Sequence, residues 1–172
     1  MIEQMLTLTR AQERRYPVTM EEICLNDVFA GVEMVISEQA VQENIALRFD
    51  APEEIKITAD QSLITQMLLN LMENALKYGK SGGHVACRAH RLGDWVQIAI
   101  SDDGVGISEE NLPHIFERFF RADTARDRTG TGLGLSIVQW IVQLHRGGVR
   151  VTSQVGKGTT FTITLPVNQN RS

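Results

Sequence analysis

Cysteine, long apolar runs and positive charge are all scarce in this sequence of 172 residues. The two cysteines, Cys24 and Cys87, lie far apart without a companion spaced for metal binding, which predicts free buried thiols in a reducing cytoplasm. No apolar run approaches the roughly eighteen residues that cross a bilayer and no signal segment is visible, so we expect a cytoplasmic segment without direct membrane contact. The net charge of −4 provides no general basic field, which argues against a nucleic-acid partner.

The remaining composition is that of a folded domain with a core. Apolar residues make up 42% and charged residues 22% of the chain, which are ordinary values for a globular protein. The length allows one domain plus a short extra element. The first dozen residues have apolar side chains at helical spacing, and Tyr16-Pro17 then ends that pattern, since a residue before proline is pushed out of helical geometry.

Hydrophobic periodicity divides the rest of the chain into helices and paired strands. Helices are expected over 27–42, with Val35 in the buried stripe, over 61–78, where Asp60 is placed to cap the helix, and over 134–145. Strands that come in pairs favour an antiparallel or mixed sheet with helices on one face. The expected fold class is therefore α+β, a two-layer sandwich with a mixed, mostly antiparallel sheet covered on one face by three helices. The six expected strands are 45–49, 55–58, 85–91, 95–101, 149–154 and 160–165.

The long helix carries a polar stripe opposite its apolar face. Asn70, Asn74 and Lys77 project from one edge, because Asn74 lies about 40° from Asn70 and Lys77 about 20° on the other side. A solvated face is one interpretation. Asparagine, however, is a poor interior helix former because its amide competes for the backbone. Amide oxygens suit Mg²⁺ and an ammonium suits phosphate, so a metal–phosphate site is the second interpretation.

Two glycine segments and an arginine-rich stretch follow. Asp102, Gly104 and Gly106 follow one another at the end of an expected strand. The glycines would let the backbone approach a flat ligand, and the Asp102 carboxylate could accept a hydrogen bond from an amino group of that ligand. The alternative interpretation is a glycine turn capped by aspartate. The segment 130–135 opens directly into a helix, whose free N–H groups favour phosphate. Four arginines within 118–128 indicate either a lid over an anion or a solvated loop.

Together and in this order, the segments NLMENALKYG, DDGVGI, IFERFFRAD, GTGLGLSIV and VGKGTTFTITLP resemble the Bergerat ATP-binding fold of histidine kinases, DNA gyrase, heat-shock chaperones and mismatch-repair ATPases. The motif sequences are most similar to those of sensor histidine kinases, and the resemblance covers about residues 25–166. The resemblance implies a remnant of a dimerisation-domain helix at 1–15, a linker at 16–24, a catalytic ATP-binding domain at 25–168 and a tail at 169–172.

On the base side, the resemblance implies that Asp102 accepts the adenine amino group and that Tyr78 stacks near the ring. Thr159 would make a polar contact near the base. The positions that would line or back the nucleotide through close backbone approach or packing are Gly104, Gly106, Ile107, Gly130, Thr131, Gly132, Leu133, Gly134 and Leu135.

On the phosphate side, the resemblance implies that Asn74 coordinates Mg²⁺, with Asn70 nearby. Lys77 would reach the phosphates of ATP or ADP, and Arg121 would contact the γ-phosphate. The hydrolysing relatives carry a general-base glutamate where this chain has Asn70, so bound ATP should survive until another nucleophile arrives, although Glu73 could still assist.

The implied activity is that of a protein histidine kinase. None of the histidines His84, His90, His114 and His145 begins a phosphoacceptor stretch, and all four are interpreted as ordinary surface or sheet residues. The γ-phosphate would then pass to a histidine on a separate dimerisation domain of the same parent and from there to a response regulator, and the parent could be anchored in the inner membrane. The alternatives are a nucleotide-binding regulator without phosphate transfer and a protein serine kinase of the anti-sigma type.

Overall fold

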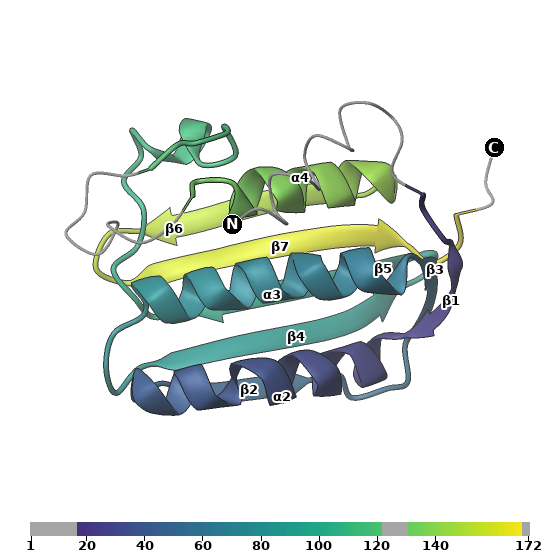
Figure 1. Ribbon diagram of the computed structural model, residues 1–172, viewed down its shortest axis with the longest axis horizontal. Helices are drawn as coiled ribbons and strands as arrows, with labels where there is room; N and C mark the ends of the chain where they lie inside the picture. The colour runs from purple at the N-terminus through teal and green to yellow at the C-terminus, as the bar shows by residue number, and fades with distance from the viewer. Residues whose placement is uncertain (1–16, 122–130, 170–172) are drawn as a thin grey trace.

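Three helices lie side by side on one face of a five-stranded sheet in the computed structural model, which describes residues 17–121 and 131–169 (Figure 1). The helices are α2 (Leu25–Gln42), α3 (Gln61–Tyr78) and α4 (Gly134–Leu144), and a 3-10 turn, η1, covers Leu112–His114. The strands are β1 (Glu21–Cys24), β2 (Ala46–Asp50), β3 (Lys56–Ala59), β4 (His84–Leu92), β5 (Trp95–Asp102), β6 (Gly148–Gln154) and β7 (Gly158–Pro166).

The main sheet has the strand order β2-β4-β5-β7-β6. Its β2–β4 pair is parallel, and the β4–β5, β5–β7 and β6–β7 pairs are antiparallel. The expected α+β class, the mixed and mostly antiparallel sheet, and the cover of helices on one face are therefore confirmed. The expected remnant at 1–15 lies outside the described residues.

The core lies between the helices and the sheet, with α3 at its centre. The eight apolar residues assigned to the inner face of α3 are all at most 4% exposed: Leu63, Ile64, Met67, Leu68, Leu71, Met72, Ala75 and Leu76. The middle strand β5 contributes Val96, Ile98 and Ile100 from alternate positions, while the residues between them point to the uncovered face. Asp60 caps α3 as expected, because its Oδ1 accepts a hydrogen bond from the N–H of Leu63 at 3.0 Å.

The first strand was not expected. β1 lies within the segment assigned to a linker, and it pairs antiparallel with β3, with Glu21 opposite Ala59 and Ile23 opposite Ile57. A four-residue strand that begins with two glutamates has too short an alternation to be recognised. Just before β1, the N–H of Thr19 donates a hydrogen bond to Oδ2 of Asp60 at 2.9 Å. The segment before β1 is therefore hydrogen-bonded to the residue that caps α3.

The buried stripe of α2 was predicted wrongly at one position. α2 begins at Leu25 rather than at 27, and Leu25 is fully buried while Val35 is 63% exposed. Leu25, Val32 and Ile36 mark the centre of the buried arc, and Val35 lies about 80° from that centre at 100° per residue. Leaving Leu25 out of the helix shifted the expected stripe toward Val35.

His145 is a correction as well, because it is neither a surface nor a sheet residue. It follows the last residue of α4, is 0% exposed, and its Nε2 accepts a hydrogen bond from the N–H of Asp60 at 3.0 Å. His84, His90 and His114 are exposed, as expected. Within the described ranges, no helix is long and apolar enough to span a membrane.

Candidate functional site

Four elements meet at one end of the sandwich, on the left in Figure 1. They are the C-terminal end of α3, the C-terminal end of β5, the N-terminal end of α4 and the turn between β6 and β7. Every described residue that the sequence assigned to a ligand site belongs to these ends or to the segments that join them, except Asn70, which lies at the middle of α3. The contacts below show how they are connected.

Asp102, the last residue of β5, lies on the sheet side of this region. It faces the helices, as do Ile98 and Ile100 before it, and it is half-buried. Its Oδ1 accepts a hydrogen bond from the N–H of Gly104 at 2.9 Å, and the backbone of Thr159 on β7 donates to it as well. Burial raises the pKa of Asp102, and these two hydrogen bonds offset only part of that increase. The carboxylate is therefore a partly desolvated acceptor.

The glycines after Asp102 are required by packing within the protein. A Cβ on Gly104 would lie 2.2 Å from the carbonyl oxygen of Tyr78, and one on Gly106, whose φ is +72°, would lie 2.1 Å from that of Gln154. The segment is thus clamped between α3 and the β6–β7 turn, since the N–H of Val105 donates to Tyr78 and its carbonyl accepts from Gly156. The close approach inferred from the sequence exists, and it includes the protein's own backbone.

The polar edge of α3 runs from the buried interior to the end of the helix. Asn70 is only 6% exposed, so it does not lie on a solvated face, and its Nδ2 has no hydrogen-bond partner among the described residues. Asn74 and Lys77 are half-buried. The Nζ of Lys77 lies 4.8 Å from the centre of the Tyr78 ring, a cation–π distance.

The N-terminal end of α4 lies beside Asn70. An ideal Cβ on Gly134, the first residue of α4, would lie 3.8 Å from Oδ1 of Asn70. Gly132 adopts φ +68°, and its carbonyl accepts from the N–H of Phe119 at 2.9 Å, which holds Phe119 against this end. Leu133 is buried and anchors the turn.

The remaining expected residues lie around this turn. The Oγ1 of Thr131 is 3.4 Å from the N–H of Leu133, Leu135 is half-buried against the core, and Arg121 is exposed. Phe116 packs edge-on against Phe161 of β7, at 6.3 Å between ring centres, so the first part of the loop rests on the sheet. Gly130 lies outside the described residues.

These contacts connect the predicted site residues in one continuous series. Gly134 lies beside Asn70, Asn74 follows one turn along α3, and Tyr78 at the end of α3 contacts Gly104, which binds Asp102. Asn70 and Tyr78 are separated by about 12 Å along the helix, at 1.5 Å per residue. An elongated ligand lying along this edge would have an acidic acceptor at one end and a helix N-terminus at the other.

Sequence reasoning missed the polar residues that hold the site together. Asp103 accepts from the N–H of His84 at 3.0 Å and lies 3.7 Å from Nζ of Lys80, which ties the loop after α3 to the end of β5. Burial by itself would raise the pKa of Asp103, but the His84 hydrogen bonds and the Lys80 charge outweigh it and lower that pKa. Ser153 on β6 is the second such residue. Neither has a sequence signal, because their partners are distant along the chain.

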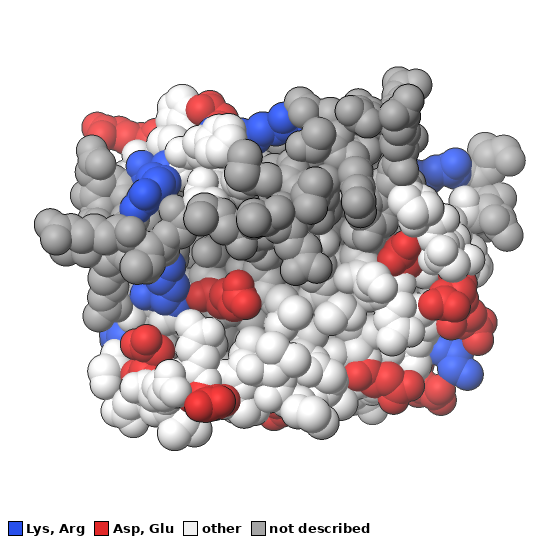
Figure 2. Space-filling model, in the orientation of Figure 1, with Lys and Arg blue, Asp and Glu red and all other residues white. Residues whose placement is uncertain are grey.

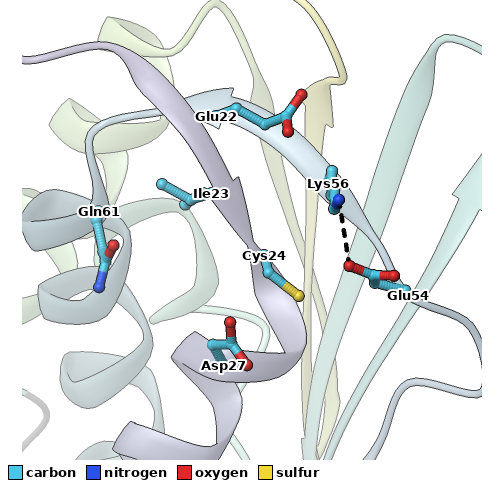
Figure 3. A pocket seen from close by; sticks show the side chains of 7 residues that line it. All are labelled: Glu22, Ile23, Cys24, Asp27, Glu54, Lys56 and Gln61. Atoms are coloured by element: carbon cyan, nitrogen blue, oxygen red, sulfur yellow. Dashed lines mark ion pairs between the residues drawn. The ribbon is translucent and has the colours of Figure 1, made fainter.

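A depression lies at the opposite end of α3, near its first residue, Gln61 (Figure 3). Its lining includes Glu22, Asp27 and Glu54, and Figure 2 shows acidic side chains gathered over the end that holds β1 and β3. Lys56 forms an ion pair with Glu54 at 3.4 Å. No predicted site residue lines this depression, and the described residues hold no cluster of three metal-ligating side chains.

The family model of histidine kinase-, DNA gyrase B-, and HSP90-like ATPases matches residues 59–169. The chain belongs to this family. The matched span contains the whole series of contacts from Asn70 to Thr159, so the predicted family resemblance is confirmed.

The curated relatives are sensor kinases. The sensor-like histidine kinase SenX3 of Mycobacterium tuberculosis is 38% identical over 171 residues, which cover 96% of this chain and 41% of SenX3. The adaptive-response sensory kinase SasA of a Synechococcus species is 38% identical over 154 residues, 88% of this chain and 40% of SasA. The chain thus spans about two-fifths of the length of these relatives.

Solved histidine kinase structures have the same fold. The catalytic domain of histidine kinase ThkA superposes with a TM-score of 0.78 at 28% identity and covers 88% of this chain and 97% of that domain. Full-length ShkA in complex with AMPPNP gives a TM-score of 0.86 at 26% identity, over 96% of this chain and 35% of ShkA. This family member therefore has the architecture of a histidine kinase catalytic domain, with an ATPase-type nucleotide site.

Proposed function

We propose that this domain binds Mg-ATP along the edge of α3 and presents the γ-phosphate to a histidine on a separate dimerisation domain of its parent protein. One observation supports this most strongly. Among the described residues, the buried Nδ2 of Asn70 has no hydrogen-bond partner, and the side chain of Asn70 lies beside Gly134 at the start of α4. A buried donor left unpaired destabilises a fold by about 1–3 kcal/mol, so its retention here favours a ligand that accepts from it. Phosphate oxygens at a helix N-terminus are such acceptors.

The base would bind at the other end of the edge. Asp102 would accept the adenine amino group, and Tyr78, at the end of α3, would pack beside the ring. Gly104 and Val105 support this position because the N–H of Gly104 donates to Asp102 and the N–H of Val105 donates to the carbonyl of Tyr78. Gly106 and Ile107 follow in the same segment and contact Gln154 and Ser153. Thr159 would add a polar contact, since it is the β7 partner of Asp102.

The phosphates and the metal would bind between Asn70 and α4. The residues present fit Mg²⁺ that is held largely by the nucleotide, because they offer amide oxygens rather than a cage of carboxylates. Asn74 would contribute a ligand, and the metal would neutralise charge on the phosphates. Lys77 would bind a phosphate, while the Gly132–Gly134 turn would donate backbone N–H groups to it. The exposed Arg121 would reach the terminal phosphate from the loop.

A preference for transfer over hydrolysis is proposed from the side chain at position 70. Water attack needs a general base beside the terminal phosphate, and at that place this chain has an amide, Asn70. The neighbouring Glu73 is exposed. What the domain supplies is position and charge neutralisation, which dominate phosphoryl transfer.

The partners are proposed from the same similarity. SenX3 and SasA are named as sensor kinases, and ThkA has been solved in complex with the response regulator protein TrrA, at 23% identity to this chain. We infer a histidine-bearing dimerisation domain as the direct partner, a response regulator further along, and a cytoplasmic position for this domain.

Two measurements test the proposal. Calorimetry with ADP and Mg²⁺ should show binding to the unaltered chain and at least about tenfold weaker binding to Asp102→Asn. Asp50→Asn is the matched control, because Asp50 lies on the edge strand β2 and pairs with Arg48 at 3.5 Å. Equal ADP affinity of all three proteins would refute the base site.

The second measurement concerns the phosphate acceptor. The chain is mixed with γ-labelled ATP and a separately made histidine-bearing hairpin from the same parent, and acid-labile label on the hairpin is expected. Acid-stable label on serine would reassign the domain as a serine kinase. ADP binding without any transfer would favour the nucleotide-binding regulator.

A further inference from the structure

Three polar residues form a row across the end of the sheet. Asp102 on β5 is the register partner of Thr159 on β7, and Thr159 is in turn the partner of Ser153 on β6. All three lie in phase with the buried residues of their strands, so their side chains face the helices. Thr159 is only 7% exposed. The row therefore belongs to the interior of the site.

The hydroxyl of Ser153 connects three segments. Its Oγ accepts a hydrogen bond from the N–H of Ile107 at 2.8 Å, donates to the carbonyl of Gly158 at 3.0 Å, and lies 2.9 Å from Oγ1 of Thr159. A serine hydroxyl has one proton and two acceptor lone pairs. The one assignment that makes all three contacts hydrogen bonds has Ser153 donating to the Gly158 carbonyl and Thr159 donating to Ser153.

The proton of Thr159 is thereby directed toward β6 and away from Asp102. Its remaining lone pairs and the carboxylate of Asp102 are all acceptors, so these two side chains present acceptors to a ligand. The exocyclic amino group of adenine is a donor, whereas the carbonyl at the same place in hypoxanthine or guanine is an acceptor. A base with a carbonyl at this position would place its lone pairs against those of Thr159 and Asp102, which is unfavourable.

We propose that Ser153 is a positioning residue for base selectivity, because it fixes the hydroxyl of Thr159 as an acceptor beside Asp102. This inference rests on the proposed nucleotide site. Without the Ser153 hydroxyl, the proton of Thr159 is released and can turn toward a base carbonyl. The preference for an amino-substituted base then falls, even though neither Asp102 nor Thr159 has changed.

The experiment compares ADP with IDP, in which the amino group is replaced by a carbonyl, by calorimetry on the 172-residue chain with Mg²⁺. In Ser153→Ala, the ratio of the IDP to the ADP dissociation constant should fall about fivefold, which corresponds to one hydrogen bond. Thr152→Ala is the control, because Thr152 is the preceding residue of β6 and is exposed on the opposite face. Its ratio should equal that of the unaltered chain.

A double-mutant cycle separates selectivity from loop support. In a Thr159→Val background the hydroxyl is absent, so adding Ser153→Ala should leave the ratio unchanged. A purely structural role for Ser153 would lower both affinities and keep the ratio constant, which would overturn the inference. If Ser153→Ala does not fold, Ser153→Cys replaces it, since a thiol hydrogen-bonds weakly, and the same change in ratio is expected.

The outcomes also distinguish this inference from the proposed site. An unchanged ratio in Ser153→Ala, with ADP binding still dependent on Asp102, would overturn the role of Ser153 alone. Failure of ADP to bind the unaltered chain would overturn the site and the selectivity together.

Discussion

The backbone N–H of Asp60 donates a hydrogen bond to Nε2 of His145 and joins the N-terminus of α3 to the C-terminus of α4. The other ring nitrogen, Nδ1, lies 2.8 Å from the carbonyl of Ile141 and must carry the proton, because that carbonyl only accepts. His145 is therefore neutral and fixed in one tautomer. It couples the two helices at the end opposite the proposed nucleotide site.

Protonation of His145 should destabilise the domain. Burial lowers its pKa below the ordinary value of 6.5, more than the Ile141 carbonyl and Asp60 raise it. The unfolded chain then binds the proton more readily, so the stability due to neutral His145 is complete above 6.5 and is lost progressively as the pH falls from that value toward the lower pKa of the folded state. Urea unfolding between pH 8 and pH 5 measures this loss.

The matched variants are His145→Ala and His90→Ala. The first should lower the free energy of unfolding by at least about 2 kcal/mol at neutral pH, because the Asp60 N–H is left unpaired, and should flatten the acid dependence. The second removes an exposed histidine and should change neither. An unaltered acid slope in His145→Ala would contradict the assignment.

Asn70 and Asn26 should give opposite results when each is changed to alanine. Asn70→Ala removes an unpaired amide, so the unfolding free energy should change by less than about 1 kcal/mol while the ADP affinity falls about tenfold. The Asn26 side chain binds the carbonyls of Ala51 and Glu53 and the N–H of Ile55, so its loss should destabilise by about 2 kcal/mol without affecting ADP. Thermal unfolding with and without ADP measures both the stability and the ADP affinity of each variant. A strongly destabilised Asn70→Ala would argue against a role of the Asn70 amide in ligand binding.

Two glycines of the site should respond differently to alanine. Gly106 has φ +72° and no room beside Gln154, so Gly106→Ala should destabilise the fold by about 2–3 kcal/mol or more. Gly134 has only the Asn70 side chain within 4 Å, so Gly134→Ala should leave the unfolding free energy within about 1 kcal/mol of the original. Its methyl group would nevertheless occupy space beside Asn70 and weaken ADP binding. Chemical denaturation and calorimetry on both proteins check this, and equal stabilities would refute it.

The two thiols should differ in reactivity. Burial raises the pKa of the Cys87 thiol to about 12, whereas Cys24 is half-buried beside the depression of Figure 3. Because the thiolate is the reactive form, an alkylating reagent at pH 8 should modify Cys24 alone in the native chain and both residues in urea. Mass spectrometry of the unaltered chain and of Cys24→Ser checks this, and native labelling of Cys87 in the latter would contradict the buried core position.

Local pattern was sufficient to predict the helices, most strands and the polar edge of α3. The eight apolar positions of α3 recur with helical spacing, and the glycine segments are contiguous, so neither depends on distant partners. β1 and Ser153 could not be found in this way. β1 exists because it pairs with β3, and Ser153 matters because Ile107 and Thr159 meet it across the fold.

Two polar residues are also more buried in the fold than the sequence suggested. Asn70 was expected in a polar stripe, but α4 covers that part of α3, and the amide is buried. His145 follows an amphipathic helix as an exposed histidine would, yet Asp60 and Ile141 supply partners for both of its ring nitrogens. Burial of a polar side chain depends on which elements pack against it, and a single sequence does not state that.

The strand order of the sheet distributes rigidity unevenly over the site. β5 and β7 each have a hydrogen-bonded neighbour on both edges, and they carry Asp102 and Thr159. Opening these strands requires breaking ladders on two sides, so their amides should exchange with deuterium most slowly, while those around Gly132 exchange sooner. The two strands that carry Asp102 and Thr159, which would contact the base, should therefore stay rigid, and the segment around Gly132 should adjust to the ligand.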